Sequence, residues 1–289
     1  MVVKIFLINA LVDGLFSGGR AGVVILRQLG QEVFLQALAA ELGLPVTAYV
    51  LPHHEAFMVR YFTPEREVET ADYAALATAQ ALFGAGMAPV TRPVTLLGRG
   101  GRHQVSRDPQ DPARLALTLD PPAPGAGEAA AEQLAAALGL GREDLAGVLP
   151  LGQSETAFCC REAEAMHRAA SAARAAILAC PGAGLTLSAP LEPGTGQAGY
   201  AVCAWDAKGE QRQVPVNLSV HARLAPFWAE RLGERQLAVH HLAERTCLMR
   251  ADLVEGSRTR LSGLMSTLIK ADPVLSELTG EVPPDLATF

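Results

Sequence analysis

The sequence has few cysteines, and their arrangement excludes a common class of metal site. None of the cysteines belongs to a Cys-x-x-Cys pair, and no Cys/His cluster has the spacing of metal ligands. A zinc centre is therefore not expected. An odd number of cysteines with apolar neighbours indicates buried, reduced thiols, as in cytosolic proteins. The five are Cys159, Cys160, Cys180, Cys203 and Cys247.

The sequence also lacks a basic cluster and a long hydrophobic run. A net charge of −6 without a stripe of Lys and Arg argues against nucleic acid as a partner. The longest apolar runs, such as residues 21–26, are far too short to span a membrane. Residues 1–8 lack the basic start and the cleavage site of a signal peptide, and they predict a strand. We therefore expect a globular, cytoplasmic protein.

Two segments about half a chain apart each predict a buried helix. Residues 70–84 and 217–233 both open on a residue that caps helices well, are apolar on almost every face, and end at a glycine. A helix that is apolar all round must be buried all round. Because each segment follows a strand-like run, the pattern predicts two similar domains with a sheet around a central helix. An anion is then expected between the domains, at the two helix N-termini.

The remaining patterns predict strands and helices in a similar order in both halves. The Pro- and Gly-rich run at 120–127 cannot be regular structure, so we place domains at 1–120 and 121–289. Residues from 266 onward are left open as a helix or a loose tail that packs back on the first domain. Further helices are predicted at 31–41, 129–138 and 162–179, and strands at 4–10, 22–27, 46–51, 56–62, 94–97, 115–119, 155–160, 185–189, 199–205, 236–240, 246–253 and 258–262.

Several motifs together resemble the phenazine-biosynthesis PhzF-like family. Residues 12–24 resemble the family's FSGNPAGVV, and residues 60–68 resemble its RWFTPxxEV. The segment 70–84 lies where the family has CGHATLAAA, and residues 214–221 lie where it has DPVTGSAH. Residues 224–233, LAPFWAERLG, closely match its LAPYWAERLG.

The resemblance implies the diaminopimelate-epimerase-like fold, an α+β architecture. This fold has two pseudo-symmetric domains, each a curved, mostly antiparallel sheet around a central helix, with the active site in the cleft between them. Family members are isomerases and epimerases that move a proton on a small carboxylic acid without a cofactor. Homodimers are common among them. The resemblance thus implies a small carboxylic-acid ligand, a homodimer and no cofactor.

The residues at the family's acid/base positions differ in this chain. Val46 stands where the resemblance expects a glutamate, Tyr73 where it expects the histidine of CGHAT, and Val214 where it expects an aspartate. Valine can neither accept nor donate a proton. Losing a positioned acid or base costs on the order of 10²–10⁴ in rate, so the usual reaction should be lost.

Other matched positions keep polar side chains or backbone groups suited to an anion. Ser219 and His221 are retained, and Asn217 replaces a threonine. The backbone N–H groups at that helix start could bind a substrate carboxylate. Leu218 replaces a glycine, which hinders a close approach of ligand to backbone. His221 is either a buried core histidine or a working one. The expected ligand-binding set is Val46, Val214, Asn217, Ser219 and His221.

Three residues are candidates for a rebuilt acid/base pair. Asp72 is expected chiefly as a helix cap, because the helix dipole makes it a weak base. Tyr73 either donates a hydrogen bond to a ligand or fills the space of the missing histidine. Glu155, in the string SETAF at 154–158, repeats the family's glutamate string in the second domain. It either faces the same cleft or is a solvated residue at a strand edge.

Three functional hypotheses follow. The first is an isomerase or epimerase that uses Asp72, Tyr73, Glu155 or Ser219. The second is a pseudoenzyme that binds a small acid without proton transfer. The third is a structural or interaction role, with the cleft filled by side chains. The residues alone favour the second and third hypotheses over the first.

Overall fold

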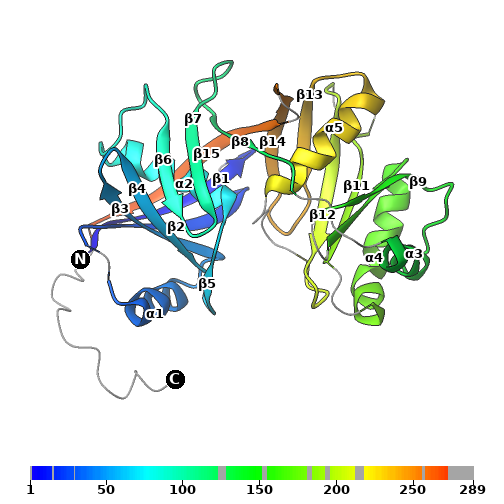
Figure 1. Cartoon of the computed structure of the whole chain (residues 1–289), viewed down its shortest axis with the longest axis horizontal. Coiled ribbons are helices and arrows are strands. Elements are labelled where there is room, and N and C mark those ends of the chain that lie inside the picture. Colours follow the sequence, from blue (N-terminus) through cyan, green and yellow to red (C-terminus); the bar gives the residue numbers. More distant parts are fainter. Residues whose placement is uncertain are drawn as a thin grey trace. The chain divides into compact units, whose positions relative to one another are not determined.

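The computed structural model describes residues 2–14, 16–28, 30–122, 128–151, 155–180, 184–192, 196–211, 218–255 and 258–272. The chain divides into two compact units (Figure 1). Of the described residues, those up to Leu117 and from Ser262 to Asp272 form unit 1, and those from Thr118 to Leu261 form unit 2. The sequence analysis placed the division after residue 120.

Unit 1 is a sheet in the order β1-β2-β3-β4-β6-β7-β8, with part of β15 (Thr259–Ala271) antiparallel to β1. The β2–β3 and β4–β6 pairs are parallel and the other pairs with a printed register are antiparallel, as predicted for a mostly antiparallel sheet. The strands are β1 (Val2–Val12), β2 (Gly19–Leu26), β3 (Val46–His53), β4 (Ala56–Phe62), β6 (Val94–Gly98), β7 (Gly101–Arg107) and β8 (Leu115–Leu119); the short β5 (Glu67–Val68) pairs with β4.

Helix α2 (Asp72–Gly84) is enclosed by unit 1, as the sequence predicts. Residues 72–79 are all buried, and eight consecutive residues point in every direction around a helix. The helix contacts β1, β2, β3 and β7. On the opposite face of the sheet, α1 (Glu32–Leu42) packs against a cluster that includes Val24, Tyr49 and Phe62. The helix over 70–84 and the helix over 31–41 are thus confirmed within two residues.

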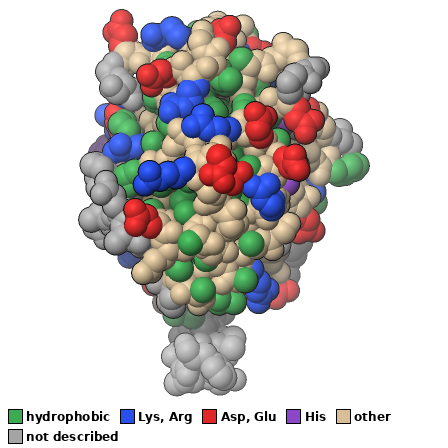
Figure 2. All heavy atoms as spheres, turned by 90° about the vertical axis from the view of Figure 1, so that its right-hand side faces the viewer, with side chains coloured by type: hydrophobic (Ala, Val, Ile, Leu, Met, Phe, Trp, Pro, Cys, Tyr) green, Lys and Arg blue, Asp and Glu red, His purple; other side chains and the backbone are tan. Residues whose placement is uncertain are grey.

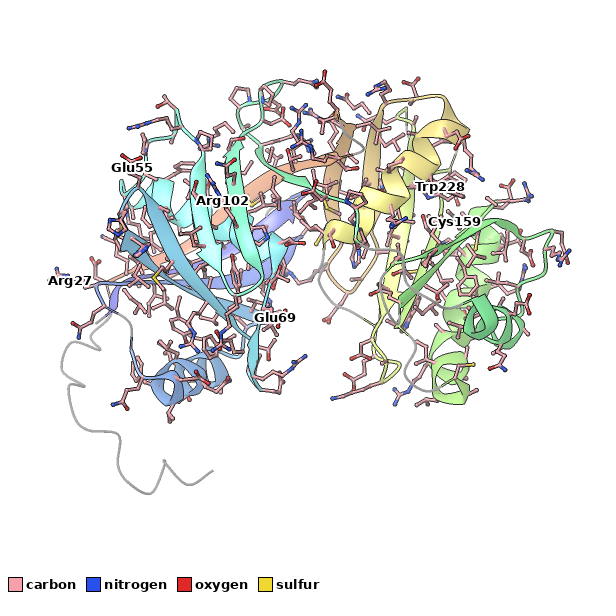
Figure 3. All side chains as sticks on the ribbon, viewed as in Figure 1. Arg27, Glu55, Glu69, Arg102, Cys159 and Trp228 are labelled. Atoms are coloured by element: carbon pink, nitrogen blue, oxygen red, sulfur yellow. The ribbon has the colours of Figure 1, made fainter. Side chains whose placement is uncertain are left out.

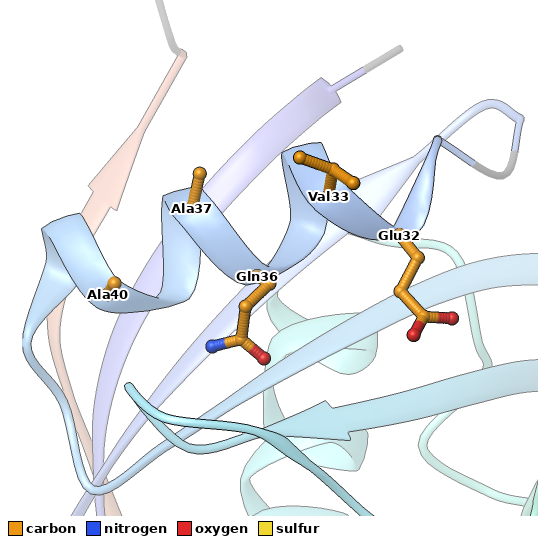
Figure 4. A pocket seen from close by; sticks show the side chains of 5 residues that line it. All are labelled: Glu32, Val33, Gln36, Ala37 and Ala40. Atoms are coloured by element: carbon orange, nitrogen blue, oxygen red, sulfur yellow. The ribbon is translucent and has the colours of Figure 1, made fainter. Parts of the chain in front are cut away.

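The outward side of α1 bears a shallow hollow (Figure 4). The Gln36 side chain at its rim donates hydrogen bonds to the carbonyl oxygens of Thr63 (3.0 Å) and Pro64 (2.9 Å). No set of polar groups converges in this hollow, so it is a surface feature of the helix. Its lining residues are Glu32, Val33, Gln36, Ala37 and Ala40.

Unit 2 is a sheet in the order β14-β13-β12-β11-β10-β9, with parallel pairs at β10–β11 and β12–β13. Its strands are β9 (Leu145–Pro150), β10 (Glu155–Cys160), β11 (Gly184–Pro190), β12 (Gly199–Trp205), β13 (Gln236–His241) and β14 (Cys247–Leu253). Its helices are α3 (Glu128–Ala137), α4 (Ala163–Ala179) and α5 (His221–Leu232), which follows a short 3₁₀ turn, η1 (Leu218–Val220).

Alternation along the strands divides the core of unit 2 into two layers. Phe158, Leu187 and Cys203 belong to the layer beneath α3 and α4. Residues of the opposite parity, such as Ser188 and Tyr200, contact α5. The two layers show why strands of this sheet are apolar at successive positions: both faces are covered.

Helix α5 differs from the prediction. Its buried residues fall at the spacing of a single stripe, and Glu230 and Arg231 in its last turn are exposed. The expectation that this second helix is buried all round is therefore wrong, because only one face packs on the sheet. The buried stripe consists of His221, Ala222, Leu224, Ala225, Trp228 and Ala229.

The outer strand β9 has two features that hinder its free edge from pairing with another strand. Among the described residues its only strand partner is β10. The register shifts at Ala146, since Gly147 lies opposite Cys159 and Leu145 opposite Cys160. The carbonyl oxygen of Ala146 accepts a hydrogen bond from Arg231 of α5 at 3.1 Å. This is a bulged strand in which a side chain already bonds one backbone carbonyl.

Other elements were missed or misjudged. Strands β5, β7 and β9 were not predicted, and residues 266–271 continue β15 rather than forming a helix or a tail.

The five cysteines are free thiols, and all except the half-buried Cys180 are buried, as predicted. Within the ranges given above, no helix is long and apolar enough to cross a membrane. The face in Figure 2 carries acidic and basic side chains interspersed with apolar ones.

Candidate functional site

Val46 and Tyr73 lie near the same end of the β2–β3 pair in unit 1. Val46 is the first residue of β3, has no exposed surface, and lies opposite Ala21 of β2. Tyr73 is the second residue of α2 and is also fully buried. Its hydroxyl group donates a hydrogen bond to the carbonyl oxygen of Arg20, the neighbour of Ala21, at 3.1 Å. The phenol therefore ties the start of the central helix to β2.

Asp72 is the first residue of α2 and not its cap. The N-cap position is Ala71, which makes no side-chain capping bond. The expectation that Asp72 caps the helix is thus wrong, since the helix begins with it. Its Oδ1 accepts a hydrogen bond from the Thr70 hydroxyl at 3.0 Å and lies 3.0 Å from Nε2 of His103. A carboxylate in the first turn of a helix is also favoured by the helix dipole.

His103 is a candidate that the sequence analysis missed. It lies in β7 opposite Leu96, and its side chain is 12% exposed. Its Nδ1 atom is buried and has no hydrogen-bond partner in the described part of the chain. Since an ionised carboxylate can only accept, the contact with Asp72 assigns the proton of a neutral imidazole to Nε2 and a lone pair to Nδ1.

Tyr61 of β4 is a third ionisable group in this part of unit 1. It is fully buried, and its hydroxyl has no hydrogen-bond partner among the described residues. Burial raises the pKa of Tyr61 well above its usual value, and the negative charge of Asp72 raises it further. Its ring lies close to Gly98, where an added Cβ would be 3.8 Å from the Tyr61 ring. Tyr61 remains a neutral phenol.

The motif at residues 60–68 has a structural role. Arg60 donates from Nε and Nη2 to the two carboxylate oxygens of Glu67, each at 2.7 Å, and from Nη2 to Glu32 at 2.6 Å. This ion pair holds the pKa of the Glu67 carboxyl below its usual value, chiefly through the hydrogen bond from Arg60. In the turn between Arg60 and Glu67, the Thr63 hydroxyl accepts a hydrogen bond from the backbone N–H of Arg66 at 3.1 Å. The motif joins β4, β5 and α1.

The glycine-rich motif at 12–24 is structural as well. Gly18 has a φ of +78°, and an added Cβ there would collide with the backbone of Ala10. The hydroxyl of Ser17 accepts from the backbone N–H groups of Asp13 (2.7 Å) and Gly14 (2.9 Å). The turn between β1 and β2 thus requires a glycine for both its conformation and its close packing.

Glu155 does not occupy the counterpart of Val46. The element orders β1-β2-α1-β3 and β9-β10-α4-β11 correspond, with a parallel pair between the second and third strands in each. Glu155 pairs with Gly184 just as Ala21 pairs with Val46, so Gly184 is the counterpart of Val46. The expected correspondence was wrong because the string SETAF belongs to the strand before the helix. The Oε1 atom of Glu155 accepts from the Thr186 hydroxyl at 2.8 Å.

His221 lies in the core of unit 2. It has no exposed surface, and its Nδ1 lies 3.0 Å from the hydroxyl of Tyr200. Burial lowers the pKa of His221 to about 3, with a smaller contribution from His241 nearby, so the ring is neutral. Trp228, labelled in Figure 3, donates from Nε1 to the Ser188 hydroxyl at 2.7 Å and stacks with Tyr200.

The predicted site residues thus fall into separate groups. Unit 1 brings together Val46, Asp72 and Tyr73 near the start of α2, and adds His103 and Tyr61. In unit 2, Ser219 lies in the 3₁₀ turn before α5, and Asn217 and Val214 lie outside the described residues. No group of three His, Cys, Asp or Glu side chains in the described ranges is placed to hold a metal ion.

Comparison with known proteins identifies the family. The model of the PhzC-PhzF family, described as phenazine biosynthesis-like protein, matches residues 8–231. The chain belongs to this family. It is 31% identical over 250 residues to an uncharacterized isomerase of Pseudomonas aeruginosa, covering 86% of this chain and 89% of that protein. A second uncharacterized isomerase of the same organism is 30% identical over 267 residues, covering 91% and 95%.

The solved structures agree with the fold. The chain is similar to a phenazine biosynthesis protein of the PhzF family from Enterococcus faecalis, with a TM-score of 0.77 and 22% identity. The match covers 95% of this chain and all of that one. This member of the PhzC-PhzF family therefore has the α+β fold expected from its motifs, and the two relatives above are named isomerases.

Proposed function

We propose that this PhzC-PhzF chain binds a small carboxylic acid and does not use positions 46 and 73 for proton transfer. The observation that carries the proposal is the hydrogen bond from the Tyr73 hydroxyl to the Arg20 carbonyl oxygen, beside the buried Val46. One position is aliphatic, and the other already donates its proton to the backbone. Family membership supports the class of ligand.

The scaffold around these positions is intact. The ion pair between Arg60 and Glu67 and the turn at Gly18 hold the two segments that match the family motifs. Since the loss of one positioned acid or base costs on the order of 10²–10⁴ in rate, losing both positions removes the family's usual route. The ligand-binding residues proposed from the sequence are Val46 in unit 1 and Ser219 and His221 in unit 2, with Val214 and Asn217 outside the described residues; no cofactor is proposed.

Thermal stability with matched ligands tests this proposal. Small amino and hydroxy acids such as alanine, proline and lactate should raise the melting temperature, and their amides should not. A ligand at 100 times its Kd stabilises the native state by about 2.7 kcal/mol, which is readily measured. If no carboxylic acid raises the melting temperature more than its amide, the proposed binding function is wrong.

The first candidate is an isomerase or epimerase that also exchanges a proton of the bound acid, and the second is a catalytically inactive pseudoenzyme. The side chains at positions 46 and 73 favour the pseudoenzyme, because Val46 cannot carry a proton and the Tyr73 hydroxyl already donates to the Arg20 carbonyl oxygen. Deuterium incorporation from heavy water separates the two candidates. An isomerase or epimerase labels the carbon that exchanges its proton, whereas a pseudoenzyme binds the acid and leaves it unlabelled. If the chain neither binds nor labels any of these acids, a structural role is the remaining hypothesis.

A further inference from the structure

A second group of ionisable side chains lies near the start of α2. Asp72 of α2 contacts His103 of β7, and the strand registers place Tyr61 of β4 on the same face of the sheet as His103, since Phe57 and His103 both pair with Leu96. We refer to Tyr61, Asp72 and His103 as the Asp72 cluster. None of the three stands at a position where the family motifs expect an acid or a base. All three are largely removed from water, with Asp72 and Tyr61 at 3% and 1% exposure.

The contact between Asp72 and His103 fixes the imidazole in one tautomer. The Asp72 carboxylate accepts from Nε2 of His103 at 3.0 Å, and the Thr70 hydroxyl holds the same oxygen at 3.0 Å. The lone pair of the ring is then on Nδ1, which has no hydrogen-bond partner in the described ranges. A carboxylate so placed orients an imidazole and stabilises the positive charge that forms when the ring takes a proton.

Tyr61 supplies the complementary group. Its neutral phenol is a hydrogen-bond donor, and its hydroxyl has no partner among the described residues. Tyr73 differs from it in this respect, because its hydroxyl already donates to the Arg20 carbonyl oxygen. The Asp72 cluster thus offers an unpartnered imidazole nitrogen, a carboxylate that orients the ring, and a hydrogen-bond donor.

We propose that His103, oriented by Asp72, is the general base of this chain, and that Tyr61 donates a hydrogen bond to the bound acid. In the proton-transfer step, the proton on the carbon next to the carboxyl group moves to Nδ1 of His103. The electron pair of the broken C–H bond passes into the carboxyl group, whose oxygen accepts from Tyr61. Return of a proton from Nδ1 to carbon completes the exchange, and no electron acceptor is required.

This inference rests on the proposed binding of a small carboxylic acid. His103 and Tyr61 are the catalytic residues, and Asp72 is a positioning residue that acts through His103. A structural contact alone would account for the Asp72–His103 bond, so the tests must read proton transfer and tautomer separately from stability.

The first experiment measures deuterium incorporation into alanine, proline and lactate by the full chain in heavy water. Wild type should label at least one of these acids. We expect His103→Gln to lower the labelling rate by about 10²-fold or more and Tyr61→Phe to lower it less. His54→Gln is the matched control, since His54 is an exposed turn residue. It should label at the wild-type rate.

The second experiment records ¹⁵N spectra of histidine-labelled protein without ligand. The signal that His103→Gln removes should show a ring with the proton on Nε2 and none on Nδ1. In Asp72→Asn, the amide can donate to Nε2, so the proton should move to Nδ1. Melting temperatures of all variants establish that each is folded before its rate is compared.

The outcomes separate this inference from the proposed function. Labelling that persists in His103→Gln, or a His103 proton on Nδ1 in wild type, overturns the assignment of the base. An acid that binds without being labelled also overturns it and leaves the binding function standing. If no acid binds, the proposed function fails and this inference fails with it.

Discussion

The two carboxylate oxygens of Glu67 accept from Nε and Nη2 of Arg60, and both bonds are 2.7 Å long. Two parallel hydrogen bonds between a guanidinium and a carboxylate are among the strongest polar contacts in proteins. The pair closes the turn after β4 and, through Glu32, reaches α1. The motif therefore ties β4 and β5 to α1.

Removing this pair should destabilise unit 1. We expect Arg60→Ala to lower the free energy of unfolding by about 2–3 kcal/mol, because hydrogen bonds to charged groups contribute about 1.5–3 kcal/mol each and the Glu67 side chain is 9% exposed. Urea denaturation measures the change. Arg99→Ala is the control: Arg99 also contacts Glu67 but is 63% exposed, and it should cost less than about 1 kcal/mol. Equal losses would contradict the assignment.

Replacing Tyr73 by phenylalanine should have a small structural effect and no functional one. The substitution removes one hydrogen bond to a backbone carbonyl, which costs about 1 kcal/mol. Ligand-induced thermal shifts and deuterium labelling should match those of wild type. A fall in labelling of tenfold or more in Tyr73→Phe would show that the phenol takes part in proton transfer.

The pH dependence of stability should reveal His221. The unfolded chain binds a proton on this residue below about pH 6.5, whereas the pKa of His221 in the native state is lowered to about 3. Between these values the unfolded state binds more protons, so stability is lost as pH falls, by up to about 1.4 kcal/mol per pH unit. Denaturation at several pH values from 7 to 4 should show a smaller slope for His221→Gln.

The matched control for this experiment is again an exposed histidine. His54→Gln should leave the slope of stability against pH unchanged, because His54 is exposed in a turn. If His221→Gln and wild type lose stability in parallel down to pH 4, the ring of His221 is charged in the native protein.

The thiols should react in a defined order. Cys180 is half-buried, whereas Cys159, Cys160, Cys203 and Cys247 are buried. Burial raises the pKa of Cys160 to about 11 and that of Cys203 to about 12, so few thiolates are present near neutral pH. With a thiol reagent such as dithionitrobenzoate, Cys180 should react first and the other four only on unfolding. Rapid reaction that persists in Cys180→Ser would contradict this order.

Hydrophobic pattern predicted the helices and most strands because it depends on local spacing. The run from Asp72 to Leu82 is apolar in every direction, and a helix of this kind can only be interior. Residues 101–107, GRHQVSR, contain two arginines and a glycine, so the sequence did not predict β7. This strand forms because pairing with β6 and β8 supplies what local propensity lacks.

The candidate site was harder to predict, because it depends on contacts between residues far apart in the sequence. His103 is 31 residues from Asp72, and only the folded sheet brings them within 3.0 Å. Glu155 was placed by a five-residue string, and the order of strands assigns that string to β10 and not to the counterpart of β3. Residue types predicted a change of chemistry at positions 46 and 73, whereas finding His103 beside Asp72 required tertiary contacts.

The bulge at Ala146 and the arginine bonded to its carbonyl have a consequence for how this protein behaves at high concentration. A straight apolar edge strand would pair with strands of other molecules and start aggregation. The bulge in Leu145–Pro150 makes its hydrogen-bonding groups irregular and so disfavours such pairing. We therefore expect Arg231→Ala to increase light scattering by concentrated protein at temperatures well below its melting temperature.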